Sequence, residues 1–424
     1  MLRCDQLLTI AIRTLQRMNL QFADHAVRVA YGLMRILDGE PGFSQEEVDR
    51  LACTALFHDI GLLHDDEDAD MLQRESAAEW AHPRYAYVYL KRLGPFPQEA
   101  TIIRYHHSGS LEIEDSGLPD HLKLAANYLL ALDTFDLFRV NDPSLTLEEA
   151  AGLLEELEPE RYDRRAVEAV VDLAHAASGN PWTQEQVWEK LLGRLGEMPL
   201  TSGQLGDLFH VLMSAIDFRN HFTVAHSFVA EHVSDLLAGW CGLDSAGRED
   251  VHLGSVLHDL GKAAIPARIL DGPHPLPAKD WEIMKSHVVL TGEILHGCVS
   301  EAVYRIAVRH HESWDVQGYP LGLGKADLTL PECIVHAADI FSALSEARSY
   351  KPPYPLTEVV EIIQGLNAQG KLHPQVAAAI LAHQEELYAQ VQQVTAQAWQ
   401  IHEEISREFL AMARGTVRRP YFAV

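Results

Sequence analysis

The sequence contains few basic residues and no long apolar run. It has 34 lysines and arginines against 61 aspartates and glutamates, a formal net charge of -27. A chain this acidic does not hold DNA, RNA or an anionic membrane surface by nonspecific attraction, so we expect neither a nucleic acid polymer nor a membrane as partner. The apolar run LLTIAI ends at Arg13. We therefore predict no membrane-spanning helix and no signal peptide.

Cysteine is also scarce. The five cysteines are scattered and contain no CxxC pair, which fits reduced thiols better than a disulfide framework. Unpaired thiols in a chain of this size are typical of a reducing compartment, and we expect a cytoplasmic protein. The five are Cys4, Cys53, Cys241, Cys298 and Cys333.

What the sequence does have is a helical period. Hydrophobic residues make up 47% and charged residues 22% of the 424, the balance of a globular protein, and a chain of this length usually forms two or three domains. Apolar residues recur three and four apart nearly everywhere, as from Phe222 to Ala225 and Val229. This spacing predicts an all-α fold.

A repeat of about 200 residues divides the chain. His25 matches His226, FHDIG matches LHDLG, and LAANYLLAL matches HAADIFSAL. Such self-similarity is the mark of a duplicated structural unit. Proline and glycine interrupt the helical pattern at GEMPLTSGQ, so we predict two tandem helical bundles, residues 1–198 and 199–424.

The end of the chain follows a different pattern. From Leu387 to Ile405 the apolar residues are spaced four and three apart, which predicts one long C-terminal helix with an apolar seam. The seam can pack on its own domain or on a second copy in a homodimer. The first alternative is favoured.

The second half carries residues typical of a metal centre. Histidine and aspartate are the ligands of catalytic Mn, Fe and Zn sites, and two neighbouring ions need six or more of them. Any one of these histidines alone would more often be a buried core residue, but the same order H, HD, H, HH, D occurs in both halves. Packing has no reason to repeat it. The seven candidate ligands are His226, His258, Asp259, His287, His310, His311 and Asp339.

These residues lie in motifs that resemble the HD-GYP subgroup of the HD-domain phosphohydrolases, bacterial enzymes that hydrolyse cyclic di-GMP or 3',3'-cyclic GMP-AMP. The matching segments are VAHS (224–227), LHDLGKAAIPARIL (257–270), MKSH (284–287), HHESWDVQGYP (310–320), HAADIFSAL (336–344) and ARSYK (347–351). They span nearly the whole second half. The resemblance therefore implies two HD-domain bundles, with the second one catalytic.

The resemblance also implies a role for each residue. The seven candidates become ligands of two divalent ions, Fe or Mn, with Asp259 as the bridging and catalytic carboxylate. Lys262 would contact the reacting phosphate, Arg348 and Lys351 would hold the second phosphate or a base, and a loop beside the site would contain Gly318, Tyr319 and Pro320. Metal-generated hydroxide would attack phosphorus in line and release a linear dinucleotide.

Four positions depart from the family pattern. Val316 replaces a glycine before GYP, Ala347 replaces an aspartate, and Ser349 replaces a proline. These three changes bear on substrate preference. Phe222 stands where members with a third metal have glutamate, so we expect two metals.

The first half keeps most of the same residue types. Its histidines and aspartate are His25, His58, Asp59, His82, His106 and His107. The alignment places Asn127 on the last aspartate and Leu62 on the lysine, and it finds no GYP loop. We therefore expect a degenerate HD domain with a regulatory or scaffolding role. The retained histidines indicate that an additional metal can still bind there.

Two other functions stay open. One is an HD-domain hydrolase of other nucleotides or phosphoesters, against which the GYP and ARSYK segments speak. The second is a catalytically silent module that binds a cyclic dinucleotide or a signalling protein, against which the complete ligand set speaks.

Overall fold

The computed structural model describes residues 2–64, 81–157, 161–178, 183–217, 225–270, 275–346 and 353–414. The chain divides into two compact units. The N-terminal unit comprises Arg3–Val211 and the chain from Glu404 onward, and the C-terminal unit comprises Leu212–Glu403 with the first two residues. The division lies inside a helix, slightly after the predicted boundary at 198/199.

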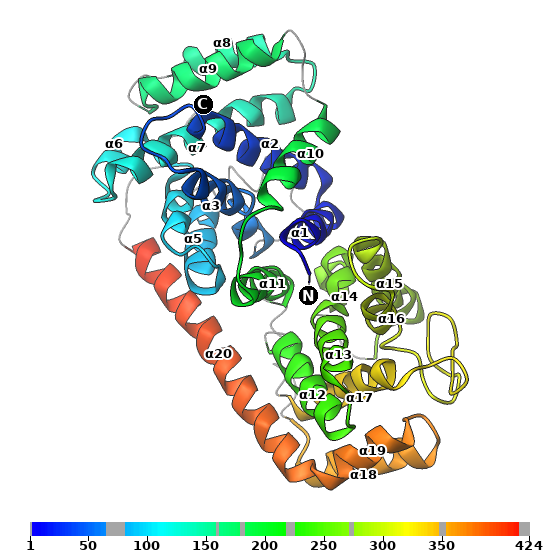
Figure 1. The fold of residues 1–424 in the computed structure, drawn as a ribbon. Coiled ribbons are helices and arrows are strands. Elements are labelled where there is room, and N and C mark those ends of the chain that lie inside the picture. Colours follow the sequence, from blue (N-terminus) through cyan, green and yellow to red (C-terminus); the bar gives the residue numbers. More distant parts are fainter. Residues whose placement is uncertain are drawn as a thin grey trace. The chain divides into compact units, whose positions relative to one another are not determined.

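All regular elements among the described residues are helical (Figure 1), which confirms the predicted all-α fold. Asp315 and Gly324 form an isolated antiparallel β-bridge. Among these helices, none combines the length and the apolarity that crossing a membrane requires. Before residue 218 the elements are α1 (Cys4–Met18), α2 (Leu20–Leu37), α3 (Gln45–Ala55), η1 (Ile60–His64), α5 (His82–Leu93), η2 (Glu99–Tyr105), α6 (Ser110–Glu114), α7 (Asp120–Asn141), α8 (Leu147–Glu155), α9 (Arg164–Ser178), α10 (Gln184–Leu195) and α11 (Ser202–Asp217).

The remaining elements repeat this order closely. They are α12 (His226–Trp240), α13 (Ser245–Leu257), η3 (Leu260–Ala264), α14 (Ala267–Leu270), α15 (Ala278–Leu295), α16 (Glu301–Val308), α17 (Leu330–Ser345), α18 (Leu356–Ala368), α19 (Pro374–Ala382) and α20 (Gln384–Arg414). In the C-terminal unit α12 packs on α13 and α17, and α15 packs on η3 and α16. In the N-terminal unit α2 packs on α3 and α7, and α5 packs on η1 and η2. The two packing schemes match helix for helix.

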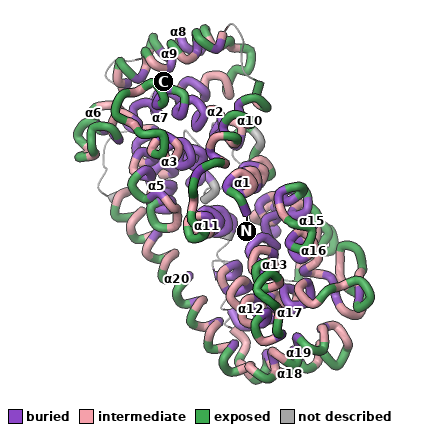
Figure 2. Tube along the Cα trace, in the orientation of Figure 1, coloured by how far each residue is buried: buried purple, intermediate pink, exposed green. Residues whose placement is uncertain are grey.

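Each bundle is built around one central pair of helices. In the N-terminal unit the pair is α2 and α7, and Figure 2 shows the buried residues gathered along both. Val27 and Leu33 of α2 and Leu129 of α7 have no measurable exposure. In the C-terminal unit Val233 of α12 and Phe341 of α17 are equally buried. Burial of such side chains contributes about 1.5–3 kcal/mol each, so these pairs fix the helices that carry the polar residues described below.

One glycine in each unit permits an unusually close helix contact. A Cβ added to Gly261 would lie 1.9 Å from the carbonyl oxygen of His287, and one added to Gly61 would lie 2.3 Å from that of His82. Only a residue without a side chain fits in either place. The glycine after each HD pair thus lets the following segment lie directly against another helix. That helix begins at His82 in the N-terminal unit and carries His287 in the C-terminal unit.

The predicted C-terminal helix exists as α20. Leu387, Val391 and Ala398 of its seam are buried in the core of the C-terminal unit. In the N-terminal unit, Arg92 pairs with Glu404 and Glu408 at 2.8 Å each. The seam therefore packs within the chain along Leu387–Ala398, the favoured of the two alternatives.

Candidate metal centre

The structure brings the seven predicted ligands of the second half together. His226 begins α12, the pair His258 and Asp259 lies between α13 and η3, and His287 lies on α15. His310 and His311 follow α16, and Asp339 lies on α17. We call these seven residues the C-terminal centre. It draws on five separate segments of the bundle, so folding rather than local sequence assembles it.

Backbone carbonyl groups orient three of its histidines. The Nδ1 atoms of His258, His287 and His310 lie 2.6, 2.6 and 2.7 Å from the carbonyl oxygens three residues earlier. A carbonyl oxygen only accepts, so each Nδ1 carries the proton and donates it. The bare Nε2 atoms then face the interior, and those of His287 and His310 are 3.3 Å apart. Two lone pairs at this distance repel each other unless a cation or proton lies between them.

Asp259 lies between two groups of histidines. Its Oδ2 atom is 3.1 Å from His258 Nε2 and 3.7 Å from His226 Nε2. Its Oδ1 atom is 3.5 Å from His287 Nε2 and has no hydrogen-bond partner although it is buried. One carboxylate thus presents each oxygen to a different group, the arrangement that a bridging ligand requires.

Lys262 and Asp339 lie on the more exposed side of the C-terminal centre. The Lys262 Nζ atom lies 2.5 Å from Asp259 Oδ2, so the lysine pairs with the carboxylate here. Asp339 Oδ1 is 3.1 Å from His226 Nε2, and its Oδ2 is 3.7 Å from His311 Nδ1. The side chains of Lys262, Asp339 and His311 are 19%, 14% and 24% exposed, against 4% for Asp259. A ligand can therefore approach from this side.

Burial and charge set the protonation of these groups. Burial lowers the pKa of His287 to about 4 and that of His311 to about 3. Both are therefore neutral near pH 7, the form in which imidazole coordinates a metal. Burial also lowers the pKa of His226, but Glu346 and Asp339 raise it to about 10. Asp259 keeps a pKa well below its usual range because His258 and Lys262 outweigh its burial.

The loop after the paired histidines is held by Glu312, a residue that the sequence reasoning did not single out. Its two carboxylate oxygens accept the backbone N–H groups of Leu321 (2.6 Å) and Leu323 (2.8 Å). Gly318 packs against backbone, because an added Cβ would lie 2.3 Å from Ser313 N. Val316 has φ 64°, a left-handed conformation that favours the glycine it replaces. The substitution thus leaves the loop in its glycine-like conformation.

Tyr319 places this loop beside the centre. Its ring lies 4.7 Å from the ring of His311, between centroids. Two residues of α15 also meet this ring: Lys285 Nζ lies 5.9 Å from its centroid, and Trp281 makes an edge contact at 6.0 Å. The sequence analysis predicted neither as a site residue. The two could have been identified because they lie four residues apart on one helix and because Lys285 belongs to the MKSH segment.

Five residues singled out from the sequence lie outside the described residues. They are Phe222, Ala347, Arg348, Ser349 and Lys351.

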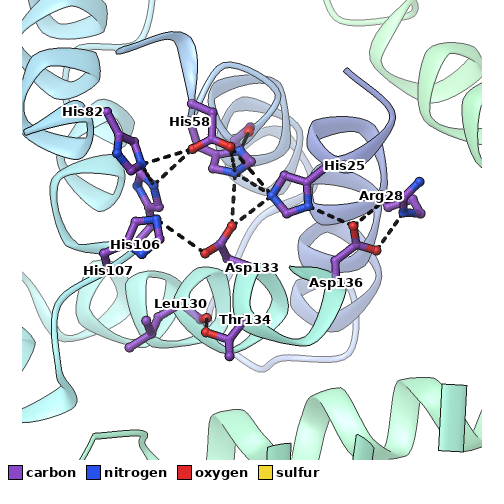
Figure 3. Close-up of polar contacts among 12 residues, drawn as sticks. His25, Arg28, His58, His82, His106, His107, Leu130, Asp133, Thr134 and Asp136 are labelled. Carbon is purple, nitrogen blue, oxygen red and sulfur yellow. Dashed lines mark hydrogen bonds and ion pairs between the residues drawn. The ribbon is translucent and has the colours of Figure 1, made fainter. Parts of the chain in front are cut away.

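The N-terminal unit assembles a corresponding cluster (Figure 3), which we call the N-terminal centre. It comprises His25, His58, Asp59, His82, His106, His107 and Asp133. The expectation that Asn127 takes the last aspartate position is wrong. Asp133 Oδ1 lies 3.0 Å from His25 Nε2, as Asp339 lies beside His226, while the Asn127 amide donates to the Lys123 carbonyl. The two positions are six residues apart on α7, so their side chains point about 120° apart around the helix.

In each unit, a carboxylate outside the centre contacts the first histidine of that centre. The sequence analysis predicted neither carboxylate. Glu346 Oε1 lies 3.3 Å from His226 Nδ1. In the N-terminal unit Asp136 Oδ2 lies 2.8 Å from His25 Nδ1 and is itself paired with Arg28 at 2.7 Å. These contacts join residues more than 100 positions apart, so no local motif signals them.

The imidazole nitrogens and carboxylate oxygens of the C-terminal centre are suited to binding divalent metals. The buried Asp259 Oδ1 and His258 Nε2 have no hydrogen-bond partner, and a buried polar group without one is costly. The groups His226, His258, Asp259 and His287, His310, His311 each bring their ligand atoms within 4.8 Å of one another. Imidazole nitrogens with a shared carboxylate suit Fe, Mn and Zn.

We expect Glu346→Gln to weaken metal binding at the C-terminal centre about 10- to 100-fold, because residues that hold a ligating histidine have effects of that size. Glutamine keeps the shape and removes the charge beside His226. Titration of the metal-free protein with Mn²⁺ measures the change. Glu358→Gln, an exposed position on α18, is the control and should bind as the wild type does. Equal affinities in both variants would contradict the role given to Glu346.

Comparisons with known proteins agree with the duplication. Family models described as "HD domain" match residues 22–136 and 210–376. A cyclic di-GMP phosphodiesterase of Thermotoga maritima is 34% identical over 187 residues, which cover 43% of this chain and 50% of that protein. The 3'3'-cGAMP-specific phosphodiesterase 2 of Vibrio cholerae is 33% identical over 186 residues, covering 43% and 35%. The chain thus spans about half the length of the first relative and about a third of the second.

Two further matches extend over most of the chain. The 3'3'-cGAMP-specific phosphodiesterase 1 of Vibrio cholerae is 24% identical over 399 residues, which cover 89% of this chain and 90% of that protein. A crystal structure of a cyclic GMP-AMP-specific phosphodiesterase from V. cholerae has a TM-score of 0.55 at 20% identity, covering 90% and 98%. This second match is a likeness in fold.

Proposed function

Because this chain belongs to the HD-domain family and carries two copies of that domain, we propose that its C-terminal centre hydrolyses a cyclic dinucleotide as a metal-dependent phosphodiesterase of the HD-GYP subgroup. The observation that carries the proposal is the geometry of Asp259, whose two oxygens face two histidine groups. Relatives named as cyclic di-GMP and 3'3'-cGAMP phosphodiesterases support the substrate class.

The chain's own residues have distinct tasks in this reaction. His226, His258, His287, His310, His311 and Asp339 would hold two divalent ions, Fe or Mn, with Asp259 between them. When bound, such ions lower the pKa of water and stabilise charge on a phosphoryl group. Lys262 lies 2.5 Å from Asp259, close enough to neutralise a phosphate oxygen or to place a proton on the leaving 3'-oxygen.

The open side of the centre suits a dinucleotide. Base–aromatic stacking contributes about 1–3 kcal/mol per base, and Tyr319 and the 43%-exposed Trp281 offer rings there. Lys285, whose Nζ lies 5.9 Å from the Tyr319 centroid, adds a positive charge to an acidic protein. Gly318 and Pro320 shape the loop, and Arg348 and Lys351 are proposed contacts to the second phosphate. These cations offset the two negative charges of the substrate.

The division of labour between the halves is part of the proposal. Residues 199–424 would carry out hydrolysis, and residues 1–198 would have a regulatory or scaffolding role. The protein would be cytoplasmic and would interact with a signalling protein. With Asp133 in place, one of the three reasons against catalysis in the first half no longer holds. The other two remain. The buried Leu62 stands where Lys262 stands in the second half, and the short helix α6 follows His107 where the GYP loop follows His311.

The test is hydrolysis by the full chain, purified without oxygen and loaded with Mn²⁺ or Fe²⁺. We expect cyclic di-GMP or 3',3'-cyclic GMP-AMP to yield a linear dinucleotide, with mononucleotides as a later product. Activity confined to other nucleotides would favour the alternative HD hydrolase. Tight binding of a cyclic dinucleotide without turnover would favour the silent signalling module.

A further inference from the structure

Three side chains meet beside the C-terminal centre without belonging to its seven candidate ligands. Trp281 and Lys285 are four residues apart on α15, so they share one face of that helix. Tyr319 belongs to the loop after the paired histidines. The Lys285 Nζ atom lies 5.9 Å from the centroid of the Tyr319 ring, and Trp281 meets the same ring edge-on at 6.0 Å between centroids. We call Trp281, Lys285 and Tyr319 the α15 platform.

Tyr319 fixes the place of this platform next to the candidate metal ligands. Its backbone N–H donates to the His311 carbonyl oxygen at 3.0 Å, and its ring lies 4.7 Å from the His311 ring, between centroids. Two residues later, the backbone N–H of Leu321 donates to Glu312 at 2.6 Å. A phosphodiester that reaches the C-terminal centre near His311 would therefore bring its neighbouring nucleoside to the platform.

The platform is open to a ligand on its outer surface. Trp281 is 43% exposed, and among the described tryptophans it alone is classed as exposed. The Lys285 side chain is 28% exposed, and its Nζ atom lies 2.7 Å from Oε1 of Glu282, a side chain that is 71% exposed. Ion pairs this open to water contribute little to stability. Lys285 can therefore exchange Glu282 for an acceptor on a ligand at small cost.

The chemistry of these groups selects among nucleobases. An aromatic side chain stacks on any base, because every base has a π-face. The ammonium group of Lys285 offers three donors and no acceptor. Guanine presents two adjacent acceptors, O6 and N7, whereas adenine presents N7 beside the N6 amino group, which is a donor. A lysine at the edge of a stacked purine therefore favours guanine over adenine.

We propose that the α15 platform is a guanine-binding subsite, in which one base of the cyclic dinucleotide stacks on Trp281 while Lys285 donates to O6 and N7 of that base. This inference rests on the proposed function and names the base that the same centre accepts. The platform reads one base only. Cyclic di-GMP and 3',3'-cyclic GMP-AMP each supply a guanine and should bind alike, whereas cyclic di-AMP should bind about 10-fold or more weakly.

Binding of phosphorothioate analogues, which resist hydrolysis, tests the subsite on the full chain loaded with Mn²⁺. The wild type should bind the cyclic di-GMP analogue about 10-fold or more tightly than the cyclic di-AMP analogue. Lys285→Met should remove this preference by weakening guanine binding. Lys279→Met is the matched control and should keep it, because Lys279 is exposed and lies six residues earlier on α15, about 120° around the helix.

Three results of that experiment would overturn the proposal. The first is no measurable binding of either analogue by the wild type, and the second is equal binding of both. The third is an equal loss of affinity for both analogues in Lys285→Met, which would make this lysine a phosphate contact. Trp281→Ala should behave differently from Lys285→Met. It should weaken both analogues by about 10- to 100-fold and leave their ratio unchanged, since stacking does not distinguish the bases.

Kinetics on the same variants separate the subsite from the proposed reaction. Lys285→Met should raise KM for cyclic di-GMP about 10-fold and leave kcat nearly unchanged, because a contact to the base is made equally in the substrate and the transition state. A fall in kcat without a rise in KM would contradict the role given to Lys285. A wild type that is inactive on every cyclic dinucleotide but keeps the guanine preference in binding would refute the proposed function and leave the subsite standing.

Discussion

Asp259→Ala is expected to lower kcat for cyclic dinucleotide hydrolysis on the order of a thousandfold, the scale on which loss of a transition-state contact acts. The carboxylate lies between both histidine groups, so its removal separates the two proposed ions and leaves buried nitrogens facing one another. Metal content should fall together with the rate. Steady-state kinetics and metal analysis on the same preparation measure both.

Lys262→Ala is the matched comparison for that variant. The lysine contacts Asp259 but contributes no ligand to the histidine groups. Its loss should mainly weaken turnover, by about 10- to 100-fold as for a residue that supports a ligand, and the metals should stay bound. Similar residual activity in the two variants would show that the roles of bridge and charge contact are assigned wrongly.

Gly261→Ala is expected to destabilise the C-terminal unit by about 3 kcal/mol or more, at the upper end of what overpacking usually costs. The new Cβ would lie 1.9 Å from the His287 carbonyl oxygen and 2.7 Å from the Thr291 backbone nitrogen. Both are backbone atoms of α15 and cannot rotate away. Since His287 belongs to the centre, metal affinity should fall as well. Urea unfolding followed by circular dichroism gives the change in stability.

Gly365→Ala controls for the substitution itself. Gly365 lies inside α18, and an added Cβ meets nothing within 4 Å. Alanine is about 1 kcal/mol more favourable than glycine in a helix, so this variant should be at least as stable as the wild type. If Gly261→Ala proved equally stable, the close approach of η3 to α15 would not be required.

The sequence predicted those parts of the fold and site that depend on periodicity and on the order of motifs. Helical spacing indicated the bundles, and the repeated order of histidines and aspartates indicated which side chains meet. The last aspartate of the first half was missed because AAN at Asn127 resembles AAD at Asp339, whereas the face of α7 toward His25 carries Asp133. The offset in residue number between corresponding positions of the two halves favours Asp133. The offset is 204 between His106 and His310, and it is 206 between Asp133 and Asp339.

The rest depends on contacts that only folding creates. Glu346 and Asp136 hold histidines on other helices, and Glu312 binds backbone groups nine and eleven residues away. No spacing rule identifies a carboxylate that acts through another residue. Side-chain exposure separates the two centres more clearly than ligand type does, and exposure cannot be read from a motif.

The central claim is that hydrolysis belongs to the C-terminal centre although both halves assemble a full set of candidate metal ligands. It is tested most directly by kcat for cyclic dinucleotide hydrolysis in two matched double variants, with folding verified by circular dichroism. His258→Ala with Asp259→Ala should abolish turnover. His58→Ala with Asp59→Ala should retain most of it while the C-terminal centre stays loaded with metal. Loss of most activity in the second variant, with the protein folded and that centre loaded, would show that the N-terminal half is catalytic or directly coupled to catalysis.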